Sequence, residues 1–402
     1  FITRMSDLLR ELSTQASSFS ALLKASEGEQ RNLGYFHTLH EIFEQPECWI
    51  QTAHALAAHT TQLSDWLDAG DKSSGLLLTG SGSSYYIGAS LAPTLQASLD
   101  IPVRAVPSGW LLLNLDELIT RHAVPGVVSF GRSGNSPEST AAVDLVLQER
   151  PECRHLIVTC NSEGKLATQY PDQKNIVLDE RVHDKSLVMT NSFTNMWLAG
   201  RFLGYLRNTD LYDSLMNHIA TSGRRLLTNG SERLFTIATG SYKSVLFLGS
   251  GARFGAAQEA SLKMLEMSSG RIATRADTYL GVRHGPLSFV QPDTLIVCFI
   301  SSDERLRAYE LDLVGELTAK DLGSSLVLVG VKIPREMLRD DAISFSYELA
   351  ETLTDNELSI LDVVVGQLLS FFRCLHEGLK PDKPSPDNVI TRVVQPFVIH
   401  SK

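Results

Sequence analysis

The chain is poor in cysteine, in basic residues and in long apolar runs. Its 402 residues contain five cysteines and no Cys-x-x-Cys pair. A disulfide framework is therefore excluded, and we expect reduced, buried thiols. Acidic residues outnumber basic ones by 46 to 36, which gives a formal net charge of −10. Because a nucleic-acid-binding protein needs a basic face, this balance argues against a nucleic-acid partner.

No run of about 18 consecutive apolar residues occurs, so we expect no membrane-spanning helix and no membrane partner. The first residues lack the apolar core of a secretory signal peptide. Together with the scattered cysteines, these features predict a cytoplasmic protein. The chain length and a hydrophobic content of 43% are sufficient for two domains with separate cores.

Short apolar runs alternate with helix-length segments over most of the chain. The first 70 residues or so have a helical pattern, with leucines on amphipathic stripes. Beyond them, apolar runs at 76–78, 127–130 and 156–158 end in polar or glycine-rich loops. This alternation predicts a parallel sheet that is covered by helices on both faces.

The pattern of runs and loops recurs 169 or 170 positions further along the chain. The matched segments are 76–82 with 245–251, 127–130 with 296–299, and 156–158 with 326–328. Three strands in register indicate two copies of one domain. We therefore predict an α/β protein with two tandem, doubly wound parallel-sheet domains and an N-terminal helical extension. The predicted ranges are 1–45 for the extension, 46–210 and 211–380 for the domains, and 381–402 for a C-terminal tail over the active site.

Ligands of doubly wound sheets bind beyond the carboxyl ends of strands, and two polar loops lie there in the first domain. The first loop contains Gly80, Ser81, Gly82, Ser83 and Ser84. A dinucleotide-binding fingerprint would need a glycine where Tyr85 stands, which disfavours a nicotinamide cofactor. Polar-ligand binding and a tight turn with a serine N-cap both stay open for this loop.

The second loop contains Ser133, Gly134, Asn135 and Ser136. Ser136 is a natural N-cap and Pro137 a natural first helical residue, so free N–H groups at a helix start are expected to face this loop. With two serine hydroxyls and the close approach that Gly134 permits, the loop predicts a site for a phosphate monoester. Plain helix capping is the alternative. The near match to Gly-x-Ser-x-Gly supports a serine hydrolase only weakly.

In the second domain, Glu259, Lys263 and Glu266 have the spacing that puts three side chains on one helix face. An isolated pattern of this type is typical of a solvated, salt-bridged face. A catalytic role competes with that interpretation because the helix follows a glycine-rich loop. His284 stands in a turn framed by glycine and proline, where a histidine can act as acid or base. The loop 301–304 is acidic and is expected to repel phosphate.

His37 and His40, followed by Glu41, have a helical spacing that metal ligands can use. No third ligand with known zinc spacing accompanies them, so a helix-surface or interface role is expected. Neither a metal nor a cofactor is predicted.

These loops and spacings resemble the sugar isomerase (SIS) family of phosphosugar isomerases and binding domains. The resemblance covers most of the chain after residue 45. Segments 80–84 and 129–136 resemble the phosphosugar loops of the family, and 259–266 with 283–287 resemble the isomerase half of glucosamine-6-phosphate synthase. The implied fold is two tandem SIS domains.

Segments 37–49 and 388–395 resemble the AgaS branch of this family. The resemblance implies that Glu266 is the proton-transfer base, that Lys263 supports it, and that His284 opens the sugar ring in a neighbouring subunit. A C-terminal active-site lysine of the relatives corresponds to Thr391 here, and Arg392 beside it is expected to replace the charge. The serines of both loops are expected to bind the sugar phosphate.

The AgaS branch is associated with galactosamine-6-phosphate deaminase/isomerase or tagatose-6-phosphate ketose/aldose isomerase activity. We therefore expect conversion of D-galactosamine 6-phosphate to tagatose 6-phosphate and ammonia by acid/base proton transfer between C1 and C2. Two alternatives stay open: isomerisation of tagatose 6-phosphate without deamination, and a non-catalytic phosphosugar sensor. The expected partners are a hexosamine 6-phosphate or ketohexose phosphate substrate and further copies of the chain, in a homodimer or higher homo-oligomer with shared active sites.

Overall fold

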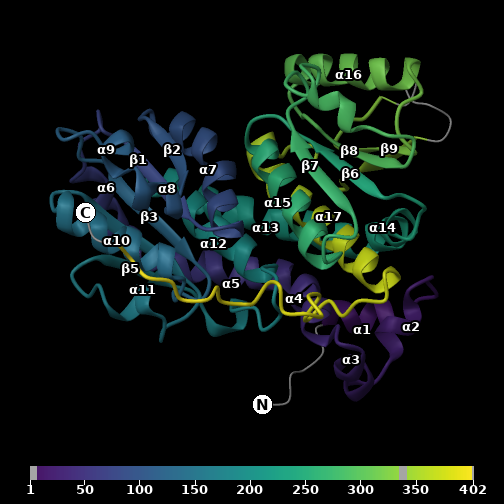
Figure 1. Ribbon diagram of the computed structural model, residues 1–402, viewed down its shortest axis with the longest axis horizontal. Coiled ribbons are helices and arrows are strands. Elements are labelled where there is room, and N and C mark those ends of the chain that lie inside the picture. The colour runs from purple at the N-terminus through teal and green to yellow at the C-terminus, as the bar shows by residue number, and fades with distance from the viewer. Residues whose placement is uncertain (1–6, 335–341, 401–402) are drawn as a thin grey trace. The chain divides into compact units, whose positions relative to one another are not determined.

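The computed structural model describes residues 7–334 and 342–400, which form two compact units (Figure 1). Each unit is built around its own five-stranded sheet and is discontinuous in sequence. Unit 1 consists of Phe1–Pro46, Lys185–Thr190 and His218–Asp387; unit 2 consists of Glu47–Asp184, Asn191–Asn217 and Asn388–Lys402. The predicted N-terminal extension therefore belongs to the unit that contains the second sheet.

Unit 2 contains the first predicted sheet. Its strands are all parallel, in the order β2-β1-β3-β4-β5. Their bounds are β1 (Leu76–Gly80), β2 (Val103–Pro107), β3 (Gly126–Gly131), β4 (Arg154–Thr159) and β5 (Lys174–Val177). Strands β1, β3 and β4 are buried along nearly their whole length, as predicted for a sheet covered on both faces.

Helices cover both faces of the sheet in unit 2. The helices α7 (Ser83–Leu99) and α12 (Asn191–Phe202) lie on one face, where Gly88 and Gly200 let them approach Leu78 and Phe130. The helices α8 (Ser108–Leu113), α9 (Leu115–Leu118) and α10 (Pro137–Glu149) lie on the other face and share its apolar core. Further helices of this unit are α6 (Thr60–Asp68) and α11 (Lys165–Thr168).

The sheet of unit 1 repeats this topology. Its strand order, β10-β9-β8-β6-β7, is the order of the first sheet taken from the opposite edge, and all strands are again parallel. The bounds are β6 (Ser244–Leu248), β7 (Ala273–Asp277), β8 (Thr294–Ile300), β9 (Ser325–Gly330) and β10 (Ile343–Ser346). The predicted fold class, two doubly wound α/β domains, is confirmed.

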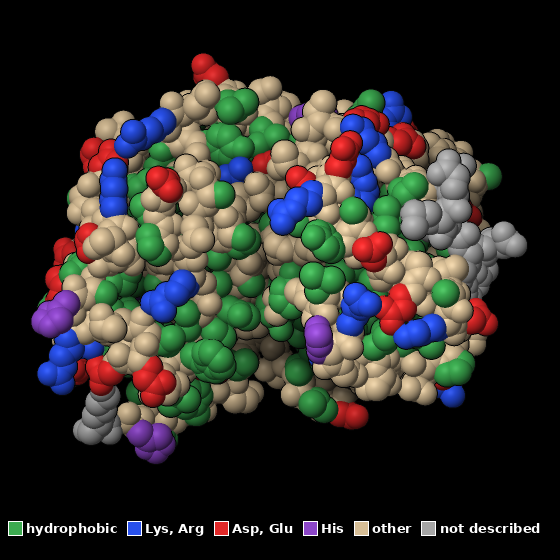
Figure 2. All heavy atoms as spheres, turned by 90° about the horizontal axis from the view of Figure 1, so that it is seen from above, with side chains coloured by type: hydrophobic (Ala, Val, Ile, Leu, Met, Phe, Trp, Pro, Cys, Tyr) green, Lys and Arg blue, Asp and Glu red, His purple; other side chains and the backbone are tan. Residues whose placement is uncertain are grey.

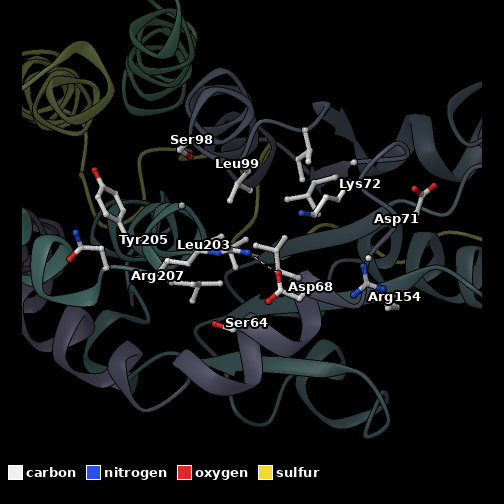
Figure 3. A pocket seen from close by; sticks show the side chains of 18 residues that line it. Ser64, Asp68, Asp71, Lys72, Ser98, Leu99, Arg154, Leu203, Tyr205 and Arg207 are labelled. Atoms are coloured by element: carbon white, nitrogen blue, oxygen red, sulfur yellow. Dashed lines mark hydrogen bonds and ion pairs between the residues drawn. The ribbon is translucent and has the colours of Figure 1, made fainter.

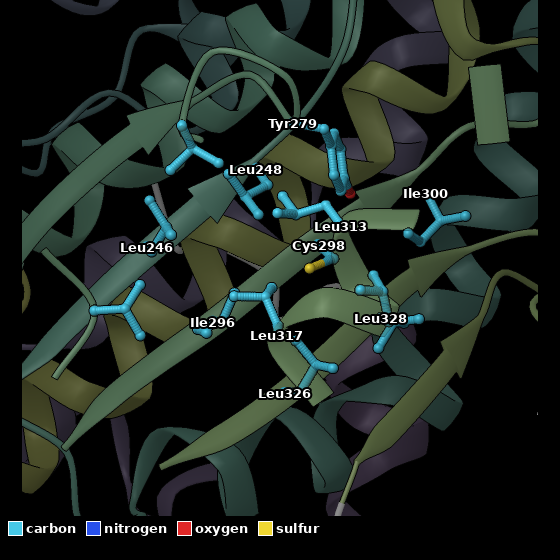
Figure 4. Close-up of a cluster of buried hydrophobic side chains, with 13 residues drawn as sticks. Leu246, Leu248, Tyr279, Ile296, Cys298, Ile300, Leu313, Leu317, Leu326 and Leu328 are labelled. Carbon is cyan, nitrogen blue, oxygen red and sulfur yellow. The ribbon is translucent and has the colours of Figure 1, made fainter. Parts of the chain in front are cut away.

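The core of unit 1 lies on both faces of its sheet. On one face, Leu313 and Leu317 of α16 (Glu304–Ala319) pack against strand residues such as Ile296 and Leu328 (Figure 4). The helices α15 (Ala252–Met267) and α17 (Asp355–His376) pack against each other, and a Cβ at Gly366 would lie 2.5 Å from that of Ala260. This close approach leaves almost no solvent between the two helices.

Further helices surround this core. They are α1 (Asp7–Ser13), α2 (Ser20–Lys24), α3 (Glu27–Leu33), α4 (Phe36–Phe43) and α14 (Ser231–Ala238). Two more, α5 (Gln45–Ala57) and α13 (Thr209–Arg225), run across the unit boundaries along the chain. The helical pattern predicted for the first 70 residues or so is confirmed by α1 to α6. All five cysteines are buried and in no disulfide, also as predicted.

Helix α17 contains a stretch that is long and apolar enough, by length and composition alone, to cross a membrane. It does not stand out in the sequence as a continuous apolar run because polar residues such as Gln367 and Ser370 interrupt it. Within the structure, 94% of this apolar stretch is buried. Packing inside the protein thus accounts for its apolar composition, as for any core helix.

Charged side chains of both signs are mixed over the surface. On the face shown in Figure 2, Lys and Arg side chains lie scattered among Asp and Glu side chains, and the described residues form no broad basic patch there.

The two sheets begin their first helices in the same way. Gly82 precedes α7 with φ 56° and ψ −127°, and Gly251 precedes α15 with φ 56° and ψ −128°. The two glycines are 169 positions apart, which is the predicted repeat offset. A residue with a Cβ rarely adopts this conformation, so both copies depend on glycine at this turn.

Gly82→Ala and Gly251→Ala should each lower the free energy of unfolding by about 1–2 kcal/mol, because of backbone strain alone. No described atom beyond the chain neighbours lies within 4 Å of a Cβ at either position. Gly109→Ala in α8 and Gly315→Ala in α16 are matched controls with the same free space and an ordinary φ. Urea unfolding followed by circular dichroism measures all four. Equal losses in test and control variants would contradict the strain argument.

Candidate active site

The first loop joins β1 to α7 and is tied to the neighbouring strand. The hydroxyl of Ser81 is hydrogen-bonded to that of Ser108, which begins α8 directly after β2. Ser83 and Ser84, each 5% exposed, form the first turn of α7. Gly80 is required by packing, since a Cβ there would lie 2.6 Å from the carbonyl carbon of Ser84. The loop is thus a rigid turn that presents partly buried hydroxyls.

The second loop follows β3, which pairs with β1 in the sheet, so both loops leave the same edge from adjacent strands. Ser136 is the N-cap residue of α10 and Pro137 its first residue, as predicted. The Ser136 side chain, however, makes no capping hydrogen bond. The alternative of plain side-chain capping is therefore wrong, and the Ser136 hydroxyl makes no hydrogen bond that caps α10.

Hydrogen bonds from the segment that follows β4 hold the second loop in place. The Asn161 side-chain amide donates to the Ser133 carbonyl at 2.8 Å, and the Lys165 N–H donates to Oδ1 of Asn135 at 3.0 Å. The Asn135 N–H donates to Oγ of Ser133 at 3.3 Å. Gly134 has a φ of 65° and leaves only 3.3 Å between a Cβ and Oγ1 of Thr159. The oxygen of Asn135 therefore holds the loop in place, together with Asn161, which was not predicted from the sequence.

Two arginines lie beside the second loop in unit 2. Arg132, 6% exposed, donates from Nη2 to the Arg392 carbonyl at 2.8 Å. The guanidinium of Arg392 in turn donates to the backbone carbonyl of Asp184. Tail residue Arg392 is thus held next to the loop residue that precedes Ser133. Arg132 was not among the predicted site residues. The sequence does show an arginine directly before Ser133 in this serine-rich segment, and this feature could have indicated it.

Helix α15 of unit 1 buries charged side chains. Glu259 and Lys263 have side-chain exposures of 0% and 1%, and Glu266 has 23%. The Lys263 ammonium forms an ion pair with Glu259 at 3.4 Å and a shorter one with Glu266. The interpretation as a solvated salt-bridged face is therefore wrong for the first two residues. In contrast, Leu265 of the same helix is 43% exposed.

The arrangement on α15 leaves one carboxylate accessible. A buried ammonium between two carboxylates has fixed partners and cannot move without a large desolvation cost. Glu266 is held by that ammonium from inside and reaches solvent at its other side. A carboxylate held in this way can accept and return a proton at a substrate carbon.

His284 lies in the turn after β7, with an exposed side chain. Its backbone N–H donates to the Gly281 carbonyl at 3.0 Å, and Gly285 follows with a φ of 112°. Among the described residues its ring has no hydrogen-bond or ion-pair partner, Glu266 included. The structure thus joins Lys263 and Glu266 directly and leaves His284 open to solvent.

In the second repeat, acidic side chains contact the loops that correspond to the two serine-rich loops of the first repeat. Glu310 accepts hydrogen bonds from the Ser250 hydroxyl at 2.7 Å and from the Ser301 N–H at 2.6 Å. Asp355 accepts from Ser302, at 2.7 Å from its N–H. Burial raises the pKa of Glu310 to about 7, while its hydrogen bonds oppose that shift. The expectation that this loop repels phosphate is consistent with this cluster.

The helical histidines serve packing. The ring of His40 stacks on Phe36 with a centroid distance of 4.3 Å, and Nε2 of His37 lies 3.1 Å from Nη1 of Arg31. Glu41 accepts hydrogen bonds from the backbone of Lys185 and Ser186, which ties segment 185–190 to α4. A helix-surface or interface role was expected, and the helix-surface part is wrong for His40, which is 7% exposed.

Comparisons with known proteins identify relatives over nearly the whole chain. A D-galactosamine-6-phosphate deaminase AgaS of Escherichia coli is 33% identical over 376 residues, which are 90% of this chain and 95% of that protein. One of Shewanella sp. (strain ANA-3) is 34% identical over 381 residues, 91% and 93% of the two chains. The crystal structure of a tagatose-6-phosphate ketose/aldose isomerase from Escherichia coli has a TM-score of 0.81 at 30% identity, covering 90% and 96%. No protein-family model matches the chain.

The fold is that of an α/β protein with two tandem, doubly wound parallel sheets of the phosphosugar isomerase type. The chain belongs to the AgaS branch of the SIS family.

Stability should depend on pH through Glu310. Its pKa is raised in the folded state, so the folded protein binds more protons than the unfolded chain between about pH 4.5 and 7, and stability falls as pH rises through that window. Glu310→Gln should remove about 2 kcal/mol of this decline between pH 5 and 7. Urea unfolding at both pH values measures it. The exposed Glu304→Gln on the same helix is the control, and an unchanged pH slope in Glu310→Gln would refute the assignment.

Proposed function

We propose that this protein is a D-galactosamine-6-phosphate deaminase that yields tagatose 6-phosphate and ammonia. The observation that carries the proposal is the ion-paired Glu266 on α15, 23% exposed above a buried Lys263. Relatives that are 33–34% identical over at least 90% of this chain bear the name of this activity.

The phosphate of the substrate is assigned to the two loops of unit 2. The Ser136 hydroxyl is not used as a helix cap, and Ser133 is held by its own loop. The start of α10 adds the partial positive charge of a helix N-terminus, and the guanidinium of Arg132 lies in the same loop. Ser81, Ser83 and Ser84 of the first loop complete the proposed set. Binding energy from the phosphate would position the reacting carbons.

Glu266 is assigned the proton transfer. In the open-chain amino sugar it would take the proton from C2 while the aldehyde oxygen on C1 gains a proton, which gives an enolamine. It would then return its proton to C1 while the nitrogen on C2 loses one, which gives the C2 imine. Water then adds to the imine carbon, and ammonia leaves as the ketose carbonyl forms. Lys263 would keep Glu266 oriented through the ion pair between them.

His284 is assigned the ring-opening proton transfer in a neighbouring copy of the chain, as the family resemblance implies. Its ring is exposed, and the turn that carries it continues through Gly285, which has a positive φ. The ring is therefore accessible for such a role. The functional protein would then be at least a homodimer with shared active sites. Arg392 is proposed to supply positive charge from the C-terminal tail, where its backbone carbonyl binds Arg132.

Glu266→Gln should lower turnover of galactosamine 6-phosphate by about 10²–10⁴-fold, because the amide cannot accept the C2 proton. Affinity for the sugar phosphate should change less than about threefold, since the amide keeps the shape and the contact with Lys263. Ammonia release and isothermal titration calorimetry measure the two quantities. Glu304→Gln, whose side chain is 92% exposed, is the matched control. Normal ammonia release by Glu266→Gln would eliminate the assignment.

The choice of reaction is tested by measuring ammonia and ketose together. Galactosamine 6-phosphate should give equal amounts of both, whereas its N-acetylated form, which lacks a free amine, should give neither. Isomerisation of tagatose 6-phosphate without any ammonia from the amino sugar would favour the ketose/aldose isomerase activity for which the Escherichia coli structure is named. Binding without turnover of any hexose phosphate would favour a sensor.

A further inference from the structure

Unit 2 contains a cavity of about 360 Å³ at the end of its sheet where β1 and β4 begin (Figure 3). Leu76, the first residue of β1, and Arg154, the first of β4, line it together with Leu99, the last residue of α7. The phosphosugar loops lie at the opposite ends of β1 and α7. The cavity is therefore separate from the site described above, and its volume is within the range of small-ligand sites.

One wall of the cavity is apolar. It is formed by aliphatic side chains from four segments: Leu67, Leu76, Leu99, Ile101, Leu203 and Leu206. Such a wall gains free energy when an apolar ligand body covers it. Tyr205 adds an aromatic side chain to the lining.

The charged side chains of the lining leave an excess of positive charge. Arg207 forms an ion pair with Asp68 at 3.3 Å, drawn in Figure 3, and this pair is neutral overall. Asp71 accepts hydrogen bonds from Ser73 and Ser74, which lower the pKa of its carboxyl. These donors stabilise the charged form, so Asp71 stays negative, and the three cations of the lining exceed its two carboxylates by one charge.

Arg154 is the cation of the lining whose hydrogen-bond donors are not all paired within the described residues. Its Nη1 is buried and has no hydrogen-bond partner among the described residues. Its guanidinium carbon lies 5.2 Å from the centroid of the Trp66 ring, which supports one side of the group. Gly70 makes room for it, because a Cβ there would lie 2.2 Å from Nη2. No described carboxylate forms an ion pair with Arg154, so an anion that reaches its guanidinium from the cavity would pair with this charge.

We propose that this cavity binds a small amphipathic anion, with its acidic oxyanion head on Arg154 and its apolar body on the leucine wall. Lys72 at the rim adds attraction for the negative charge. The assignment does not depend on the reaction proposed above, because none of its residues belongs to the phosphosugar loops or to α15.

Two fluorescent probes with similar aromatic bodies test the proposal. Anilinonaphthalene sulfonate carries the anionic head, and N-phenylnaphthylamine is neutral. The wild-type protein should bind the sulfonate at least about tenfold more tightly, as expected for one charge-assisted contact. Arg154→Gln should remove that advantage and change the affinity for the neutral probe less than about twofold. Lys72→Gln, at an exposed residue, should weaken only the sulfonate, by about two- to threefold.

Three further variants locate the probe. Leu99→Trp should fill the cavity and abolish binding of both probes. Arg305→Gln removes the same charge from an exposed position on α16 of unit 1 and should have no effect. The double variant Ser133→Ala, Ser136→Ala should also leave sulfonate binding unchanged. Equal affinities of the two probes for the wild-type protein, an unaffected Arg154→Gln and Lys72→Gln, or loss of binding in the serine variant would each overturn the proposal.

Discussion

The proposed chemistry depends on the buried ammonium of Lys263 and its two carboxylate partners on α15. Glu259 and Lys263 are 0% and 1% exposed, so neither charge can be kept inside the protein without the other. The helix that carries them packs tightly on α17, where a Cβ at Gly366 would lie 2.5 Å from that of Ala260. The same ammonium holds Glu266 at the solvent-exposed end of the cluster. A costly buried ion pair that leaves one carboxylate accessible is typical of a site kept for chemistry.

The two halves share one fold and differ in what fills the ends of their strands. Both sheets have the same strand order, and both first helices follow a glycine with the same dihedral angles. In unit 2 the loops present serine hydroxyls and a helix start. In unit 1 the corresponding space is closed by Glu310, Asp355 and the buried pair of Arg253 with Asp362. This difference supports the proposal that the first copy binds the phosphate and the second does not.

The sequence predicted the buried strands, the repeat and the loop positions, because these leave strong local signals. Continuous apolar runs mark β1, β3, β4, β6, β8 and β9, which are buried on both faces. The strands β5, β7 and β10 were missed because they lie at sheet edges, are partly exposed and carry few apolar residues. The burial of Glu259 and Lys263 could not be predicted either, since their charged side chains at helical spacing are typical of a solvated face and burial depends on tertiary packing. The same holds for Asn161, whose role follows from the proximity of two loops.

The most direct test follows the hydrogen at C2 of the substrate. Galactosamine 6-phosphate deuterated at C2 is incubated with the wild-type protein and with Glu266→Gln, and NMR records where the label goes. We predict that the wild-type protein moves deuterium from C2 to C1 or to solvent as ammonia appears, and that the variant leaves it at C2. Loss of the label from C2 at an unchanged rate in the variant would contradict the central role of this carboxylate.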